Sequence, residues 1–356
     1  MAWDFLVAKS DLRRTEFREI EPPPLEDGQV RLAIESFALT ANNITYAVFG
    51  EAMRYWDFFP APEGFGRVPV WGHAHVEASA HPDIGVGRRF YGYWPMSTHL
   101  TVQARPGQAG FTDVSPHRAH LAAVYNQYQA VGADDGLEAH KALLQPLFIT
   151  SFLIEDFLDE SALFGGKSVI LSSASAKAAI GLAHLLKRRG AARVVGLTSP
   201  RNVAFVEGLG VEGLGVYDQV VTYADLPTAP IERPAVFVDF AGDAAVLRAV
   251  HETFGTDLAF SLLVGGTHWE TERGGGSLPG PKPVFFFAPD RIAKRRQDWA
   301  PGEFETRYRA AWGPFVADAP RWLTVEHGAG REAMQAAFLT QVDGGTSPSV
   351  GVVLAP

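Results

Sequence analysis

A run of small residues at 172–176 joins a short aliphatic segment to a segment with helical spacing. The aliphatic segment, 168–171, is typical of a strand buried on both faces. The helical segment ends in three basic residues and Gly190, a combination favoured at helix carboxyl termini. A second aliphatic strand follows at 193–197. This strand–turn–helix–strand pattern presents the N–H groups of a helix start to an anion, so it predicts a site for the phosphates of a dinucleotide.

The composition limits the class of protein. The chain has 356 residues, of which 47% are hydrophobic and 20% charged, as expected for a soluble globular protein of about two domains. A formal net charge of −9 disfavours nonspecific binding to nucleic acid. The absence of cysteine excludes disulfides, thiolate nucleophiles and cysteine-ligated metals. Since no membrane span or signal-peptide pattern is found, we expect a cytoplasmic protein that binds neither nucleic acid nor a membrane.

Short β-like segments separated by turn residues fill the first 115 or so residues and predict an antiparallel β unit or partial barrel. Helices are predicted at 118–131, at 137–145 and from 146 to 158. Strands then alternate with helices up to a strand predicted at 285–288, which indicates a parallel, doubly wound sheet. From Trp322 onward the pattern is strand, helix and strand.

This order of elements resembles the medium-chain dehydrogenase/reductase superfamily, especially its zinc-independent quinone-oxidoreductase-like branch. The resemblance implies an α/β fold with a Rossmann cofactor-binding domain, residues 131–318, and a GroES-like partial β-barrel domain formed by both chain ends, residues 1–130 and 319–356. The segments that carry the resemblance are collinear: GQVRLAIESFALTANNITYAVFG, RVPVWGHAHVEAS, GVGRRFYGY, PLFITSFLIEDFL, VFVDFAGD, LLVGG and SVGVVLAP.

The turn after the first Rossmann strand departs from the family pattern. The family commonly has Ala-x-x-Gly-x-x-Gly, where this chain reads Ala-Ser-Ala-Lys-Ala-Ala, with Lys177 at a glycine position. Lysine does not allow the close backbone approach of glycine, but its ammonium suits a cofactor phosphate. The alternative is a solvent-facing lysine in the first helical turn. The cofactor contacts implied by the resemblance are Thr150, Ala174, Ser175, Ala176, Lys177, Tyr223, Gly242, Val264, Gly265 and Phe287.

The residues after the second Rossmann strand indicate which nicotinamide cofactor is bound. An NAD site usually has an acid there, which accepts a hydrogen bond from the ribose 2′-hydroxyl. Here Thr198, Ser199 and Arg201 follow the strand, and no acid occurs before Glu207. Arginine suits a phosphate, so the sequence predicts NADPH. The alternative for Arg201 is an exposed arginine at a helix start.

No metal site is expected. His73, His75 and Glu77 alternate, so on a strand they would share one face. Together they would span roughly 13 Å, too far for one tetrahedral site without a bulge.

The segment around Tyr46 offers groups for reduction chemistry. Reducing a C=C bond conjugated to a carbonyl creates an enolate, which needs a hydrogen-bond donor or proton source. The resemblance implies that Tyr46 faces the nicotinamide, so Tyr46 and Asn43 are the candidate catalytic residues; the alternative is that both close a turn. Aromatic residues suited to lining an apolar substrate pocket, or else a core, are Tyr46, Trp56, Phe59, Trp71 and Trp94.

Two functions therefore stay open. The first is a zinc-independent, NADPH-dependent reductase of an apolar α,β-unsaturated carbonyl, enoyl compound or quinone. The second is a nucleotide-binding or regulatory protein that kept the fold and lost catalysis, which the atypical Ser-Ala-Ser-Ala-Lys turn favours. In either case a homodimer is expected, because the Phe-Phe-Phe segment within 284–288 would leave an apolar sheet edge uncovered.

Overall fold

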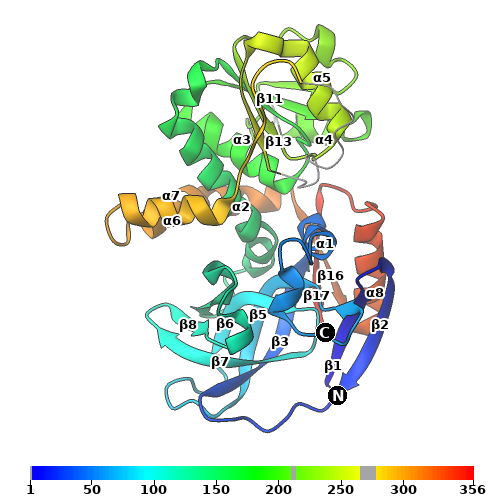
Figure 1. Ribbon diagram of the computed structural model, residues 1–356, viewed down its shortest axis with the longest axis vertical. Coiled ribbons are helices and arrows are strands. Elements are labelled where there is room, and N and C mark those ends of the chain that lie inside the picture. The colour runs from blue at the N-terminus through cyan, green and yellow to red at the C-terminus, as the bar shows by residue number, and fades with distance from the viewer. Residues whose placement is uncertain (1, 210–213, 265–277) are drawn as a thin grey trace. The chain divides into compact units, whose positions relative to one another are not determined.

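The structure is a computed structural model that describes residues 2–209, 214–264 and 278–356 (Figure 1). It divides into two compact units. Unit 1 comprises Met1–Leu143 and Leu323–Pro356, and unit 2 comprises Leu144–Trp322. The first division lies within the helix Glu138–Glu160. The sequence-based domain boundaries, after 130 and after 318, remain predictions. Among the described residues no helix is long and apolar enough to cross a membrane.

Unit 1 contains an eight-stranded sheet that curls on itself, because β3 pairs with both β5 and β7. The strand order is β16-β17-β3-β5-β6-β9-β8-β7. The last two strands of the chain lie in this sheet beside β3, so both chain ends build it, as predicted (Figure 1). Its strands are β3 (Gln29–Leu39), β5 (Pro69–Ser79), β6 (Arg89–Pro95), β7 (His99–Gly107), β8 (Gly110–Asp113), β9 (Gln127–Val131), β16 (Thr324–Ala329) and β17 (Val350–Ala355).

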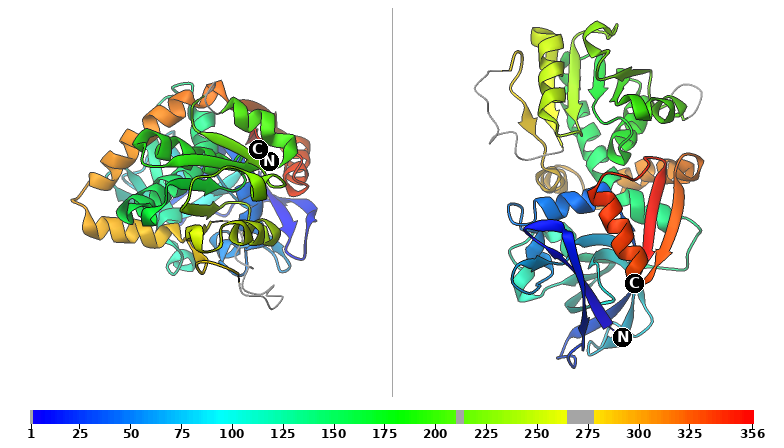
Figure 2. Two further views of the ribbon diagram at one scale, coloured as in Figure 1. Left: turned by 90° about the horizontal axis from the view of Figure 1, so that it is seen from above. Right: turned by 90° about the vertical axis from the view of Figure 1, so that its right-hand side faces the viewer.

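A small antiparallel sheet and two helices complete unit 1. The predicted period-2 pattern of β3 is confirmed, since Val30, Leu32 and Ile34 are buried on one face. Helix α8 packs beside the small sheet (Figure 2). The ring centroids of Phe5 and Phe338 lie 5.4 Å apart. The remaining elements are β1 (Ala2–Ala8), β2 (Asp11–Ile20), β4 (Phe65–Gly66), α1 (Ala41–Val48) and α8 (Gly330–Val342).

Unit 2 contains a six-stranded parallel sheet of order β12-β11-β10-β13-β14-β15. In chain order this is 3-2-1-4-5-6, the doubly wound Rossmann arrangement, so the predicted fold class is confirmed. The strands are β10 (Ser168–Leu171), β11 (Arg193–Thr198), β12 (Gln219–Thr222), β13 (Ala235–Asp239), β14 (Leu258–Leu263) and β15 (Val284–Phe285). The helices are α2 (Glu138–Glu160, which begins in unit 1), α3 (Lys177–Arg189), α4 (Val203–Gly208), α5 (Ala244–Phe254), α6 (Ala288–Asp298) and α7 (Glu303–Asp318).

Three sequence-based assignments were wrong. The helix predicted at 118–131 is instead two short 3-10 turns and β9, because pairing of β9 with β6 and β8 overrides local propensity. The two helices predicted at 137–145 and 146–158 form the single helix α2, which contains Pro146. The strand predicted at 285–288 is only Val284–Phe285, and α6 begins at Ala288, where the following proline favours a helix start.

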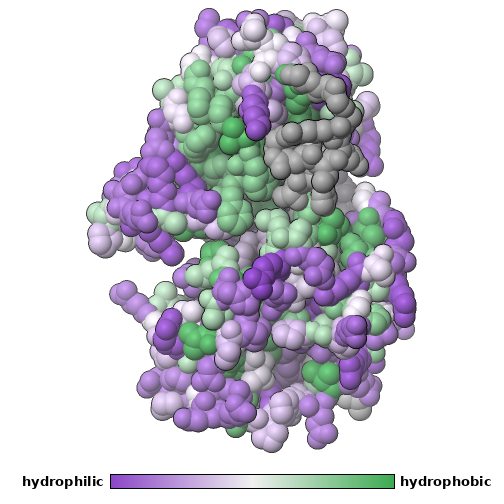
Figure 3. Space-filling model, in the orientation of Figure 1, coloured by the Kyte–Doolittle hydropathy of each residue, from purple (hydrophilic) through white to green (hydrophobic). Residues whose placement is uncertain are grey.

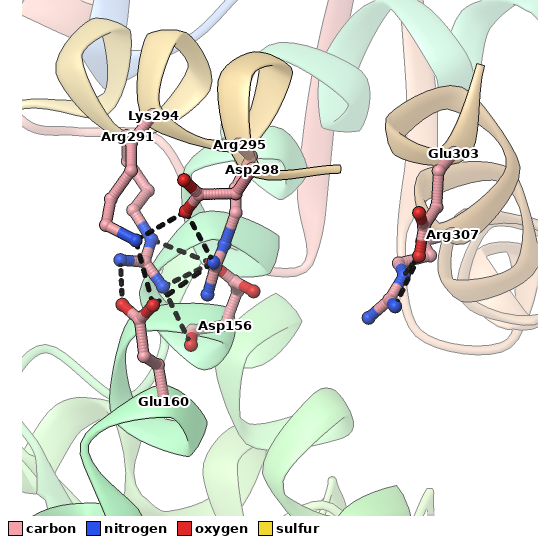
Figure 4. Close-up of polar contacts among 8 residues, drawn as sticks. All are labelled: Asp156, Glu160, Arg291, Lys294, Arg295, Asp298, Glu303 and Arg307. Atoms are coloured by element: carbon pink, nitrogen blue, oxygen red, sulfur yellow. Dashed lines mark hydrogen bonds and ion pairs between the residues drawn. The ribbon is translucent and has the colours of Figure 1, made fainter. Parts of the chain in front are cut away.

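Charged residues fix α6 against α2 within unit 2 (Figure 4). Asp156 accepts hydrogen bonds from Arg291 and Arg295, each with 2.7 Å between Nε and Oδ2. Lys294 donates to Glu160 over 2.9 Å. These basic side chains therefore form ion pairs with acidic residues of α2. The surface over α6 and α7 is strongly hydrophilic (Figure 3).

Candidate functional site

The carboxyl ends of β10 and β13 lie side by side where the strand order of the unit 2 sheet reverses. After β10 the chain passes through α3 to β11 on one side, whereas β13 pairs with β10 on the other. In open α/β sheets, ligands bind outside the carboxyl ends of the strands at such a switch point. The candidate nucleotide site of unit 2 therefore lies at this edge.

Ser172 and Asp239 join the two strands at this edge. The Ser172 hydroxyl donates to Asp239 over 2.6 Å and accepts from the N–H groups of Phe240 and Ala241 at 2.8 and 3.0 Å. Asp239 also accepts from the N–H of Gly242 at 3.3 Å. Burial raises the pKa of Asp239, and these hydrogen bonds oppose the rise. The network fixes the loop after β13, in which Gly242 has a positive φ of 64°.

Two tyrosines hold the turn after β10. The N–H of Ser173 donates to the Tyr223 hydroxyl over 3.0 Å, and the Tyr217 hydroxyl donates to the carbonyl of Ala174 over 2.7 Å. Behind the turn, a Cβ added at Gly196 would lie 2.9 Å from the Cβ of Ala174. The packing of turn against strand is thus close even though alanine occupies this position of the family pattern.

Helix α3 begins at Lys177, directly after this turn. Its N-cap residue, Ala176, has no side-chain acceptor, and its first turn contains no acidic residue, so its N–H groups suit an anion. Lys177 is half-buried, and burial lowers its pKa to about 8. Asn202 donates to the Ser175 hydroxyl over 3.1 Å, which brings the turns after β10 and β11 together.

The residues predicted to select NADPH follow β11. Thr198 is buried, and its hydroxyl has no hydrogen-bond partner in the described parts of the chain. Ser199 precedes a short 3-10 turn, Pro200–Asn202, on which Arg201 is exposed. Arg201 is thus exposed at the surface, whereas Thr198, three residues earlier, has a buried hydroxyl without a partner among the described residues.

The remaining predicted cofactor contacts lie on other elements of unit 2. Val264 follows β14, and its N–H donates to the Asp239 carbonyl over 2.9 Å, which places it at the same sheet edge. Phe287 follows β15 and is 39% exposed. Thr150 is half-buried on α2, next to Ser151, whose hydroxyl donates to Ala178 in the first turn of α3. Gly265 lies outside the described residues.

In unit 1, Asn43 lies on α1 and not in a loop. Its Oδ1 accepts from the backbone N–H of Thr40 over 2.7 Å, and its Nδ2 donates to the Pro69 carbonyl over 2.9 Å. These contacts fix the start of α1 against β5. The buried side chain of Asn43 therefore has a structural role.

Tyr46 lies one turn further along α1 and is only 6% exposed. Its hydroxyl accepts a hydrogen bond from Trp71 Nε1 over 3.3 Å. Burial, and then the nearness of Tyr55, raise the pKa of Tyr46, while hydrogen bonding with Trp71, Asn42 and Tyr125 opposes the rise. Since the direction of the shift is upward, Tyr46 is protonated at neutral pH.

The predicted substrate-lining aromatics lie in different places. Trp71 faces Tyr93 across β5 and β6, with ring centroids 5.0 Å apart, on the same side as Tyr46. Phe59 is fully buried at the border of this group, 5.8 Å from Tyr93. Trp94 points to the opposite face, where its Nε1 donates to Gly72.

Trp56 fills a tight space in the core. A Cβ added at Gly50 or Gly66 would lie 2.0 or 2.3 Å from its ring. The indole is therefore enclosed by backbone on these sides, and Trp56, like Trp94, packs in the core of unit 1.

Sequence reasoning did not single out Tyr93 and Tyr125, whose rings pack near that of Tyr46. Tyr93 has a period-2 signal, because Tyr91 and Tyr93 lie opposite His73 and Trp71 in the register of β5 and β6. Tyr125 lies in the segment wrongly predicted as helix, where its direction was not foreseeable.

The three potential metal ligands on β5 have separate surroundings. His75 contacts Glu35 at 3.0 Å and Glu77 contacts His99 at 3.2 Å, whereas the ring of His73 packs on Tyr91. The residues that the structure describes contain no group of three or more His, Cys, Asp or Glu side chains arranged to hold a metal ion.

Solved structures share this architecture over the whole chain. CurA from Vibrio vulnificus, solved in complex with NADPH, is 14% identical, and the match covers 99% of both chains with a TM-score of 0.65. The quinone oxidoreductase from Thermus thermophilus is 15% identical, with 99% of this chain and 100% of that chain covered and a TM-score of 0.58. The quinone oxidoreductase from Pseudomonas syringae pv. Tomato DC3000 is 16% identical, with 100% of both chains covered and a TM-score of 0.56.

These matches show that the chain shares the overall fold of CurA and of these quinone oxidoreductases. No curated protein sequence matches the chain significantly. By sequence, residues 37–347 match one family throughout, and the chain belongs to that family, which is described as "Protein of unknown function (DUF2855)".

Proposed function

We propose that the protein is an NADPH-dependent, zinc-independent reductase of an apolar α,β-unsaturated carbonyl, enoyl compound or quinone. The observation that carries the proposal is the start of α3, where an uncapped helix terminus, Lys177 and the turn that bears Arg201 lie at one sheet edge. The fold supports it, because CurA and the Thermus thermophilus quinone oxidoreductase were both solved with NADPH.

The residues at this edge fit a dinucleotide phosphate. The Ser173 N–H already donates to the Tyr223 hydroxyl. The groups that would bind the phosphate are therefore the N–H groups in the first turn of α3 and the Lys177 ammonium. Arg201 is exposed and free of an acidic neighbour in sequence, as binding of a 2′-phosphate requires. When bound, NADPH supplies the hydride.

Tyr46 is the residue in unit 1 that we assign to proton donation. It is buried among aromatic rings, it is protonated at neutral pH, and it holds a hydrogen bond from Trp71 that stabilises charge on its oxygen. Asn43 has both polar atoms of its side chain engaged and acts by placing α1. An apolar, planar substrate matches aromatic surroundings of this kind.

A fluorescence titration with NADPH and NADH tests the proposal, followed by turnover with a panel of enones and quinones. We expect NADPH to bind more tightly than NADH and one member of the panel to be reduced. If neither nucleotide binds, the reductase proposal is wrong. If NADPH binds tightly and no panel member is reduced, the second candidate, a nucleotide-binding or regulatory protein, is favoured.

We also propose a cytoplasmic homodimer joined through the β15 edge. β15 is only Val284–Phe285 and lies at the end of the sheet, and Val284 and Phe287 are 45% and 39% exposed. An apolar sheet edge of this kind favours pairing. Sedimentation equilibrium tests this: we expect a dimer that Phe287→Asp weakens, and a monomeric wild type would contradict it.

A further inference from the structure

Four tyrosines from four elements of unit 1 form what we call the tyrosine cluster: Tyr46, Tyr55, Tyr93 and Tyr125. The ring centroids are 4.6 Å apart for Tyr46 and Tyr55, and 4.8 Å apart for Tyr93 and Tyr125. Tyr125 lies 6.0 Å from Tyr55 and 6.4 Å from Tyr46. The cluster thus brings together phenol rings that are distant in sequence.

Several donors surround the hydroxyl of Tyr46. The indole of Trp71 is a donor only, so the Tyr46 oxygen must accept this hydrogen bond. Hydrogen bonding with Asn42 and Tyr125 likewise lowers the pKa of Tyr46 against the effect of burial. These hydrogen bonds oppose part of the effect of burial, which still raises the pKa of Tyr46, so loss of any one of them should raise it further.

Tyr125 connects Tyr46 to the rest of the cluster. Its ring centroid lies 6.4 Å from that of Tyr46 and 6.0 Å from that of Tyr55. Burial, and then the nearness of these two phenols, raise the pKa of Tyr125. It is half-buried, whereas Tyr46, Tyr55 and Tyr93 are at most 9% exposed. Tyr125 is therefore the member through which the cluster exchanges protons most readily with solvent.

The hydroxyl of Tyr93 gives an independent indication of a polar ligand. Tyr93 is fully buried, and within the described residues its hydroxyl has no hydrogen-bond partner. A buried donor without an acceptor is destabilising, because it has lost its hydrogen bond to water. The ring centroids of Tyr46, Trp71 and Tyr125 lie 5.6, 5.0 and 4.8 Å from the ring centroid of Tyr93. An oxygen of a carbonyl or quinone ligand in the cluster would satisfy this donor.

We propose that Tyr125 is a relay residue that returns a proton to Tyr46 each time the substrate is reduced; this rests on the proposed function. Hydride from NADPH forms a C–H bond at the β-carbon, and the C=C π pair moves toward the carbonyl oxygen, which takes the Tyr46 proton. Tyr46 then takes a proton from Tyr125, and Tyr125 takes one from Tyr55 or from water. Each hydride is thereby matched by one proton drawn from solvent.

A titration without cofactor or substrate tests the contact on which the relay depends. Difluorotyrosine at position 46, a more acidic phenol, allows its pKa to be followed by fluorine NMR in the folded protein. We expect Tyr125→Phe to raise this pKa by about one unit, because the phenolate loses a hydrogen bond. The matched control is Tyr308→Phe in unit 2, which removes another buried tyrosine hydroxyl and should leave the pKa unchanged. Equal pKa values in both variants would overturn the relay.

Kinetics then test the relay in turnover. Tyr125→Phe should lower kcat by about 100-fold, increase the solvent deuterium isotope effect and leave NADPH affinity unchanged, whereas Tyr308→Phe should behave like wild type. A folded Tyr125→Phe protein with unchanged kcat and isotope effect would overturn the proposal. Absence of NADPH binding by the wild type would refute the proposed function and with it the relay, while the fluorine titration would still show whether Tyr125 supports Tyr46.

Discussion

Tyrosine hydroxyls serve different partners in the two candidate regions. At the turn after β10 in unit 2, the hydroxyls of Tyr217 and Tyr223 bind backbone groups and hold the chain in one conformation. In the tyrosine cluster of unit 1, the hydroxyl of Tyr46 accepts a hydrogen bond from Trp71 and its ring packs against other phenols, while the hydroxyl of Tyr93 is buried without a partner among the described residues. We expect the same chemical group to be structural where its partner is fixed backbone, and to take part in proton transfer where it lies among other titratable groups.

This difference separates two kinds of mutational effect. Loss of a hydroxyl at the turn should reduce stability and leave proton transfer intact. Loss of one in the cluster should reduce turnover and leave nucleotide binding intact. The predictions below test that separation.

The largest effect is expected at the ion pair that holds the loops around the cluster. Arg118 and Asp113 are almost fully buried with 3.2 Å between their charged atoms, and Arg118 also donates to the Phe58 carbonyl. Asp113→Ala should lower the free energy of unfolding by about 3–5 kcal/mol, since it leaves a buried charge without its counterion. Urea denaturation measures the loss.

Asp318→Ala is the control for this prediction, because Asp318 pairs with Arg321 at an exposed site. Exposed pairs contribute roughly 0–1 kcal/mol. Similar losses in the two variants would show that the buried pair does not anchor the cluster.

Tyr46→Phe should give the largest effect on chemistry. Removing the proton donor should reduce kcat by about 10²- to 10³-fold, the range typical of general acid catalysis. NADPH affinity should be unchanged, because Tyr46 lies in unit 1 and the phosphate-binding elements lie in unit 2. Steady-state kinetics and fluorescence titration measure the two quantities, and a variant that loses nucleotide affinity but keeps kcat would reverse the assignment.

Arg201→Ala should weaken NADPH binding by about 10- to 100-fold, the worth of charge-assisted hydrogen bonds to a phosphate. NADH, which lacks the 2′-phosphate, should bind as before. The control is Arg296→Ala, which removes an exposed arginine on α6. An unchanged NADPH/NADH preference in Arg201→Ala would refute the 2′-phosphate assignment.

The pH dependence of NADPH binding tests Lys177. Its pKa in the free protein is about 8, lowered by burial, so the ammonium is charged below pH 8 and loses its proton above it. If the charged form binds a phosphate, the Kd for NADPH should be flat below pH 8 and rise above it, by at most about tenfold per pH unit. Lys177→Met should bind more weakly at pH 7 and lose this pH dependence. The same rise in Lys177→Met would assign it to another group.

The sequence predicted the sheets better than the sites. Strands such as 168–171 are buried on both faces, so their sequences are apolar throughout and can be recognised locally. The collinear order of the elements then indicated the Rossmann sheet. The segment at 118–131 was misread because the pairing of β9 depends on β6 and β8, which local sequence does not encode.

The candidate site was predicted in part, for a related reason. Residues at strand ends, such as Ser175 and Arg201, follow from chain order, because parallel strands place their carboxyl ends at one edge. Chain order does not predict which group a given side chain will contact. Sequence reasoning placed Tyr223 beside a cofactor but gave no sign that its hydroxyl holds Ser173, and it grouped Trp71 with Trp94 although they point to opposite faces.

Tyr223→Phe should have the smallest effect and tests the comparison most directly. The variant keeps the ring and removes only the acceptor for the Ser173 N–H, so the free energy of unfolding should fall by about 0.5–1.5 kcal/mol. Because that N–H would then be free to bind a phosphate, NADPH affinity should be unchanged or slightly higher, and kcat should stay within about twofold of wild type. Urea denaturation, fluorescence titration and steady-state kinetics measure these quantities. A fall in kcat as large as that of Tyr46→Phe would show that the turn's tyrosines also take part in proton transfer, and the distinction between structural and chemical hydroxyls would fail.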